Sequence, residues 1–320
     1  MVIKVENLKK AYGGKTALCG LTLNVEKGEI CALTGLRGAG KTTAMDIIAG
    51  AMQADSGQVE IDGVLLDSET SQARQKIGYV PSKPPVYQDM TPRAYLKFLA
   101  DARGYSGREA AEMIDHAFEL MNLQDVSDKP VKRLARGVRR MVSMAQAVFF
   151  GPSALLIDEP SDELDPKEVL TLRNALTELA KGRAVLLASS NLTEIETLAD
   201  RILVMDKGRI VGECGRHELQ NLYVMTDEMC VVTRSPREAV EKALAKEKGL
   251  SVTDVLNCAD GLSVRVKMQG DGRAQLFRAL NGLEVLEMTA ARRKPDELME
   301  YLVSERFDGS RLERSEGGNA

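Results

Sequence analysis

The chain has 320 residues, 44% of them hydrophobic and 28% charged, which is enough for one large domain with a buried core and a smaller second domain. Its formal net charge of -4 gives no overall attraction to nucleic acid, so we expect no nucleic-acid partner. The five cysteines form no C-x-x-C pair, so they signal neither a zinc site nor a disulfide framework and fit reduced thiols in a cytosol.

The chain begins with MVIKVENLKK, which alternates apolar and polar residues like a strand and lacks the apolar core of a signal peptide. No apolar run approaches the length of a membrane span. The sequence therefore predicts a chain that is soluble by itself.

Short β-like segments separated by glycines fill the chain from residue 2 to about 66, with one helix expected at 40–50. A strand at 76–81, KIGYVP, precedes the proline-rich stretch PSKPPVY. Apolar residues at helical spacing then predict helices between 92 and 150. We therefore expect a helical insert from about 83 to 150.

Strand and helix alternate again beyond the insert. The apolar strand SALLIDEP precedes a helix expected at about 166–181, and the strand AVLLASS precedes one at about 192–200. A hairpin, RILVMDKGRIVG, and a connecting helix at 216–224 follow. This order predicts a parallel sheet flanked by helices.

A second set of strands and helices begins at about residue 227. Its segments read MCVVTR, REAVEKALAKE, LSVRVKMQ, QLFRALNG, VLEMTAAR and DELMEYLV. They predict a small α/β domain over 227–306, in addition to a main domain over 1–220. The polar, glycine-bearing tail at 307–320 is predicted to be disordered.

The segment GLRGAGKT at 35–42 fits the phosphate-loop pattern G-x-x-x-x-G-K-[ST], after the apolar strand EICAL and before a helical run. Its glycines let backbone amides surround a phosphate, and the helix N-terminus adds partial positive charge. Lys41 would bridge the β and γ phosphates, and the Thr42 hydroxyl would ligate Mg²⁺. The alternative, a glycine-rich turn capping an ordinary helix, does not explain the order of strand, loop and helix. The expected nucleotide-binding residues are Gly35, Leu36, Arg37, Gly38, Ala39, Gly40, Lys41, Thr42 and Thr43.

The segment ALLIDEP at 154–160 is an apolar strand that ends in two adjacent carboxylates. Asp158 would hold the Mg²⁺ ion through water, and Glu159, the expected catalytic residue, would polarise an attacking water. An acidic strand end alone is often only solvated. Its pairing with a phosphate loop favours nucleotide hydrolysis.

The first 220 residues, with these two motifs in this order, resemble the nucleotide-binding subunits of ATP-binding cassette (ABC) transporters. VKRLARGVRRMVSMAQAVFFGPSALLIDEP follows the family's signature helix into the acidic strand, and LDP at 164–166 matches the end of its D-loop. Tyr12 stands where the family stacks an aromatic ring on adenine, although an aromatic on a strand surface is also common. The C-terminal domain and KIGYVPSKPPVYQDMT most resemble bacterial drug, sodium or lipid exporter ATPases that pair with separate membrane subunits.

The resemblance implies an α/β, P-loop NTPase fold of the ABC type, with a mixed sheet core, an antiparallel β subdomain and a helical subdomain. It implies ATP and Mg²⁺ as ligands. It also implies an integral membrane permease as partner, and a second cassette in a homodimer or heterodimer, with each ATP between one phosphate loop and the other chain's signature loop. The implied location is cytoplasmic, peripheral on the inner face of the cell membrane.

The signature loop departs from the family's usual L-S-G-G-Q. Ala135 has no hydroxyl for the γ phosphate bound by the partner chain. Arg136 would either offer a positive charge there or point to solvent, and Gly137 keeps a backbone donor. The residues at the signature positions are Leu134, Ala135, Arg136, Gly137 and Val138.

Two switch positions also depart from the family. Ser82 stands where the family places Gln or Glu, and it is too short to link the metal water to the membrane subunit. Ser190, in the elbow LLASSN, stands where a histidine contacts the γ phosphate and the attacking water. The chain's two histidines, His116 and His217, lie elsewhere in the sequence. A serine donates one neutral hydrogen bond but carries no imidazolium charge.

The D-loop SDELD has Asp162 and Glu163 where the family has a small pair, and these carboxylates either approach the dimer seam or are simply solvated. Arg37, where many members have Asn, adds a cation beside the phosphate loop. That charge would offset part of the lost γ-phosphate contact.

These observations predict a transport-coupled ATPase with slow turnover, because γ-phosphate donors are lost while Glu159 is retained. Two alternatives remain open. One is a non-hydrolysing regulatory module that binds ATP and dimerises with a competent cassette. The other is a soluble cassette acting on ribosomes or DNA, although such relatives usually carry two cassettes or a coiled-coil insertion.

Overall fold

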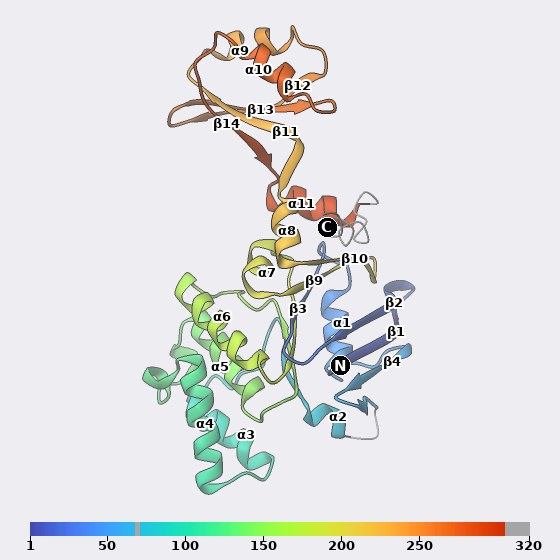
Figure 1. The fold of residues 1–320 in the computed structure, drawn as a ribbon. Coiled ribbons are helices and arrows are strands. Elements are labelled where there is room, and N and C mark those ends of the chain that lie inside the picture. The colour runs from blue at the N-terminus through green and yellow to red at the C-terminus, as the bar shows by residue number, and fades with distance from the viewer. Residues whose placement is uncertain (68–70, 305–320) are drawn as a thin grey trace, which may run out of the picture. The chain divides into compact units, whose positions relative to one another are not determined.

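The computed structural model describes residues 1–67 and 71–304 (Figure 1). Its contacts divide the described residues into two units, one formed by residues 1–216 together with 299–304, the other by His217–Leu298. Each unit has its own hydrophobic core. The tail predicted at 307–320 lies outside the described residues.

The larger sheet of the first unit has six strands in the order β10-β9-β3-β8-β7-β6, parallel except for β10, which is antiparallel to β9. Strands β3, β7 and β8 are buried along their whole length, as expected for apolar strands covered on both faces. The strands are β3 (Ile30–Thr34), β6 (Ile77–Val80), β7 (Ala154–Asp158), β8 (Ala184–Ala188), β9 (Arg201–Asp206) and β10 (Arg209–Gly215).

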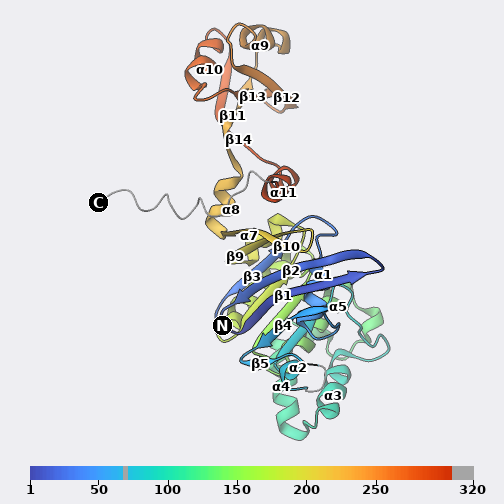
Figure 2. The ribbon, with the colours of Figure 1, turned by 90° about the vertical axis from the view of Figure 1, so that its right-hand side faces the viewer.

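The smaller sheet of this unit is antiparallel, in the order β2-β1-β4-β5. Its strands are β1 (Ile3–Tyr12), β2 (Lys15–Val25), β4 (Ser56–Ile61) and β5 (Val64–Leu65). Helix α1 (Lys41–Ile48) contacts strands of both sheets, and Figure 2 shows the β1-β2 pair lying over it. The core is continuous from Ile3 and Leu21 through Met45 to Leu156.

Six more α-helices lie entirely within the first unit, among the residues that the structure describes. They are α2 (Gln72–Gln75), α3 (Pro92–Ala102), α4 (Gly107–Met121), α5 (Arg136–Val148), α6 (Pro166–Ala180) and α7 (Leu192–Leu198). Helices α3, α4 and α5 pack together, while α6 and α7 contact the larger sheet. The predicted mixed core, antiparallel subdomain and helical subdomain are thus confirmed; the short helix α2 was not predicted.

The second unit carries a four-stranded antiparallel sheet in the order β12-β13-β11-β14. Helices α9 and α10 lie on one face of it (Figure 1) and close a core around Val231, Val264 and Leu276. The elements from residue 216 onward are α8 (Arg216–Leu222), β11 (Val224–Thr233), α9 (Arg237–Leu244), β12 (Leu250–Cys258), β13 (Gly261–Met268), α10 (Arg273–Ala279), β14 (Val285–Arg292) and α11 (Pro295–Val303). The sequence prediction omitted β12.

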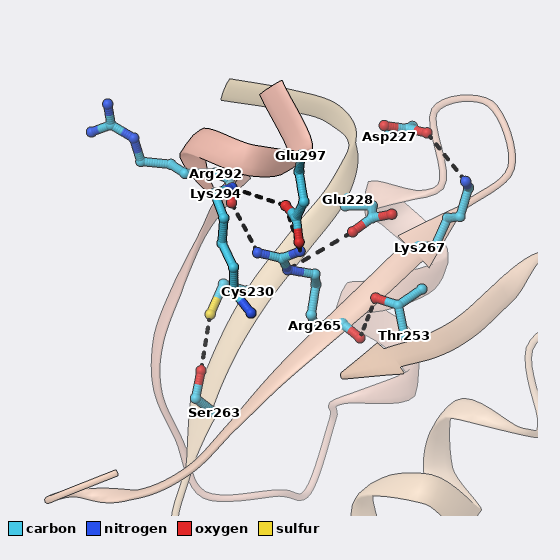
Figure 3. Close-up of polar contacts among 10 residues, drawn as sticks. All are labelled: Asp227, Glu228, Cys230, Thr253, Ser263, Arg265, Lys267, Arg292, Lys294 and Glu297. Carbon is cyan, nitrogen blue, oxygen red and sulfur yellow. Dashed lines mark hydrogen bonds and ion pairs between the residues drawn. The ribbon is translucent and has the colours of Figure 1, made fainter. Parts of the chain in front are cut away.

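On the other face of that sheet, Arg265 forms a polar cluster (Figure 3). Its guanidinium donates 2.9 Å to the carbonyl of Arg292 and lies 3.4 Å from the carboxylate of Glu297 and 3.9 Å from that of Glu228. The neighbours Val264 and Val266 point the opposite way, into the core. Residues 264–266 of β13 therefore alternate between the apolar core and the polar face, as expected for a strand that is covered by the core on one face.

Among residues 1–67 and 71–304, we find no helix with the length and apolar character to cross a membrane. The domain bounds 1–220 and 227–306, and the insert at 83–150, stay predictions.

Candidate functional site

The loop that joins β3 to α1 passes too close to neighbouring backbone for side chains at two of its glycines. Gly35 and Gly40 have φ values of 148° and 106°. A Cβ at Gly35 would lie 2.0 Å from the carbonyl oxygen of Met205, and one at Gly40 would lie 2.5 Å from that of Ala17. The shape of the loop therefore requires glycine at both positions.

Lys41 opens α1 and turns its ammonium back into this loop. The side chain is buried, and Nζ donates 2.7 Å to the carbonyl of Gly35 and 3.2 Å to that of Leu36. Burial lowers the pKa of Lys41, and the negative charges of Glu159 and Asp158 oppose that shift. The cation is thus held at the centre of the loop, where carboxylates help to keep it charged.

Thr42 and Asp158 place two side-chain oxygens next to each other beside the loop. Thr42 Oγ1 donates 2.9 Å to Asp158 Oδ2, whereas Asp158 Oδ1 is buried with no hydrogen-bond partner. Burial is the main cause that raises the pKa of Asp158, and the Thr42 hydrogen bond opposes it. A hydroxyl beside an unpartnered carboxylate oxygen suits a hard cation such as Mg²⁺, which keeps most of its waters or phosphate ligands.

Glu159, the next residue, turns toward the elbow after β8. Its backbone has φ 50°, and its N–H donates 2.7 Å to the carbonyl of Ala188. The carboxylate accepts from both elbow hydroxyls: Ser189 Oγ is 3.1 Å from Oε2, and Ser190 Oγ is 3.4 Å from Oε1. The carboxylate is therefore oriented from two sides.

A cavity of about 570 Å³ brings most of the predicted residues together. Tyr12 stands at its wall, 46% exposed, with its hydroxyl 2.7 Å from the sulfur of Met52. Asp162 of the D-loop also contributes to the wall. The predicted site residues that line the cavity are Tyr12, Arg37, Gly38, Gly40, Lys41, Thr42, Thr43, Glu159 and Ser190.

Other predicted residues lie outside the lining of this cavity. Leu36 is exposed and Ala39 is buried in the core. The carbonyl of Ser82 accepts 2.9 Å from the guanidinium of Arg140. None of the signature residues 134–138 lines the cavity.

Two departures from the family pattern meet each other within the chain. Arg136, at the start of α5, lies 3.3 Å from the carboxylate of Glu163 in the D-loop. The Arg136 side chain is 73% exposed, so the pair lies in solvent, and the two predicted alternatives, a charge for the partner's nucleotide or a solvated side chain, stay predictions. Gly137 lies close to the first turn of α6, because a Cβ there would lie 2.0 Å from Oε2 of Glu168, the residue that completes the capping box with the N-cap Asp165.

Sequence reasoning missed three polar residues behind the cavity: Arg140, Ser189 and Glu194. Arg140 is 4% exposed and donates to the carbonyls of Pro81, Ser82, Asp158 and Glu159, so it joins the strand ends of β6 and β7. Ser189 and Glu194 are buried and hydrogen-bonded to each other. A charged residue on the buried face of the helix after the signature loop was a signal that could have revealed Arg140.

The sequence profile of the ABC transporter family matches residues 18–162. The linearmycin resistance ATP-binding protein of Bacillus subtilis is 32% identical over 216 residues, which cover 66% of this chain and 68% of that protein. This chain belongs to the ABC transporter family. The Nod factor export ATP-binding protein I of Burkholderia lata is 28% identical to this ABC protein over 299 residues, covering 92% of the chain and 98% of that relative.

The fold of the ABC protein agrees with this assignment. A dimeric bacterial ABC transporter cassette superposes with a TM-score of 0.62 at 24% identity, covering 67% of this chain and 98% of that one. The chain is thus an ATP-binding subunit of an ABC transporter, and its activity is ATP hydrolysis, as the sequence predicted.

Proposed function

We propose that the cavity between Tyr12 and Glu159 binds Mg–ATP, with the adenine against Tyr12 and the phosphates in the loop from Gly35 to Thr43. Three features support this placement. Glycines give the loop a backbone path that other residues could not follow, the Lys41 ammonium is fixed among loop carbonyls, and helix α1 begins at the loop. Binding would exchange the carbonyl acceptors of Lys41 for phosphate oxygens.

We propose Thr42 and Asp158 as the protein groups that hold Mg²⁺. When bound, the ion would supply positive charge to the phosphates. The unpartnered Oδ1 of Asp158 supports this role, because a buried carboxylate oxygen without a partner is costly unless a cation or water satisfies it. A bound cation would also reverse the raised pKa of Asp158.

Glu159 is the group proposed to act on the attacking water. The position of its carboxylate at the cavity wall is the observation that most favours hydrolysis over a purely regulatory ATP-binding module. Its carboxylate lines the cavity together with Lys41 and Thr42, and the hydroxyls of Ser189 and Ser190 orient it. A water between this carboxylate and the phosphates would lose its proton to a positioned base.

Turnover is proposed to be slow. Ser190 offers one neutral hydroxyl at the cavity wall, and Ala135 offers none at the signature loop. Removing one preorganised donor commonly costs about 100- to 1,000-fold in rate. Such losses are not simply additive. The retained Glu159 favours residual hydrolysis over complete inactivity.

The cassette is further proposed to dimerise and to work on the cytoplasmic face of the cell membrane with a separate permease. The named relatives support this proposal, since one is an export ATP-binding protein and one solved cassette is a dimer. Export is the direction proposed, by the same likeness.

The function is tested by asking whether the chain co-purifies with a membrane protein encoded by an adjacent gene, followed by an ATPase assay of the complex. We expect a stable complex whose Mg²⁺-dependent ATP hydrolysis disappears in Glu159→Gln while ATP remains bound. A complex that binds ATP but hydrolyses none would instead support the regulatory alternative. Failure to find any membrane partner would contradict the transport role.

A further inference from the structure

Ser189 directly follows β8 and is fully buried, and its hydroxyl lies between two carboxylates. One is Glu159 at the cavity, with Oε2 at 3.1 Å. The other is Glu194 of α7, whose Oε2 is in short hydrogen-bond contact with Ser189 Oγ. The backbone N–H of Asn191 also donates to the same hydroxyl oxygen, at 3.0 Å.

These three contacts restrict where protons can be. A serine hydroxyl has one hydrogen to donate and two lone pairs to accept with, and the Asn191 N–H uses one lone pair. It can therefore satisfy two carboxylate oxygens only if it donates to one and accepts from the other. One of the two glutamates must then carry a proton.

The surroundings select Glu194 as the protonated partner. Its side chain is 7% exposed, and burial raises its pKa against the opposing effect of hydrogen bonds from Ser161 and Ser189. Glu159, in contrast, lies at the wall of an open cavity. Glu194 Oε1 accepts from the backbone N–H of Ser161, which leaves Oε2 to bear the proton toward Ser189. The charged groups that act on it are Glu159, which favours the neutral acid, and the Arg140 guanidinium, which favours the ion.

We propose that Glu194 is a positioning residue for ATP hydrolysis, held as a neutral acid that donates to Ser189, which in turn donates to Glu159. This proposal rests on the proposed function, in which Glu159 acts on the attacking water. The chain of hydrogen bonds holds one oxygen of Glu159 from below, and Ser190 holds the other. The elbow thus serves the site through hydroxyls that orient a carboxylate.

The test measures single-turnover ATP hydrolysis and ATP affinity in the full-length protein and four variants. Glu194→Gln keeps a donor toward Ser189 and an acceptor toward Ser161, so its hydrolysis rate should stay within about 2-fold of the parent. Ser189→Ala and Glu194→Ala each remove a link in the series of hydrogen bonds from Glu194 to Glu159. Each should lower the hydrolysis rate about 10- to 100-fold with little change in ATP affinity.

The conservative pair, Glu194→Gln and Ser189→Ala, decides the matter even if Glu194→Ala does not fold. A rate for Glu194→Gln as low as that for Ser189→Ala would show that a carboxylate is needed and overturn the proposal. An unchanged rate for Ser189→Ala would also overturn it. Glu159→Gln separates this outcome from failure of the proposed function: full activity in that variant refutes the role of Glu159 itself.

Discussion

Ser190 is the residue whose replacement should change the rate most informatively. Its hydroxyl lies 3.4 Å from Glu159 at the cavity wall. Ser190→His should raise ATP hydrolysis, because an imidazole there can orient the attacking water and stabilise charge on the γ phosphate. We expect about 10-fold or more when Ala135→Ser and Ser82→Gln accompany it, measured by phosphate release.

Glu159→Gln in the same triple variant is the control, and it should remove both the residual and the restored activity while ATP stays bound. A triple variant that binds ATP and dimerises, yet turns over no faster than the parent, would show that these three positions do not limit the rate.

Some site residues could be read from the sequence and others could not, for a physical reason. The phosphate loop and the Asp158-Glu159 pair are local sequence patterns. Phosphate and metal binding require these residues at fixed spacings along the chain, so the sequence alone reveals them. Ser189 and Glu194 matter only because β7 and β8 pair side by side. In sequence, Glu194 looks like any acidic residue in the first turn of a helix.

Helix α5 offers a test at the scale of a single element. Its N-cap is Ala135, with φ -59° and ψ 157° and no side-chain cap. Ala135→Ser should stabilise the first unit by about 0.5–2 kcal/mol, because a serine there accepts from a free N–H of the first turn. Denaturant unfolding measures the change.

Ser106→Ala at the N-cap of α4 is the matched control, since Ser106 makes no side-chain cap bond, and the cost should be smaller. Equal and opposite changes in the two variants would contradict this view of the α5 cap.

Strand β3 buries a thiol whose protonation should oppose unfolding. Burial raises the pKa of Cys31 to about 12, with smaller effects from nearby charges. The pKa of a cysteine thiol in an unfolded chain is about 8.5. The stabilisation of the fold by the protonated Cys31 thiol is therefore complete below about pH 8.5 and is lost as the pH rises toward 12. At pH 8, a thiol reagent should label the exposed Cys258 first and Cys31 only on unfolding.

Mass spectrometry of the labelled peptides would report this order. Rapid labelling of Cys31 in the native protein would mean that the core around β3 opens far more often than its burial indicates.

Strand β12 shows why one element escaped sequence reasoning. Leu250, Val252 and Val255 all pack against the core of the second unit, but the spacing changes from two residues to three. The cause is a register shift between Val252 and Asp254. Such a bulge breaks the two-residue alternation on which strand prediction depends.

The described residues form two units with separate cores, and the cavity proposed to bind Mg–ATP is lined by residues of the first unit. Mg–ATP should therefore slow hydrogen exchange in β3, β7 and α1 but leave β11 and β13 unchanged. At about 100 times Kd the expected gain for the binding unit is ~2.7 kcal/mol. Equal protection in both units would show that they open together.

The most direct test of the nucleotide site is calorimetric titration of ATP with Mg²⁺ into the full-length protein and into Lys41→Ala. The Lys41 ammonium is the main charge fixed inside the loop, so its removal should weaken binding by about 100-fold or more. The parent is expected to bind and the folded variant to show little or no heat. Unchanged affinity in a folded Lys41→Ala protein would contradict the assignment of this cavity to ATP.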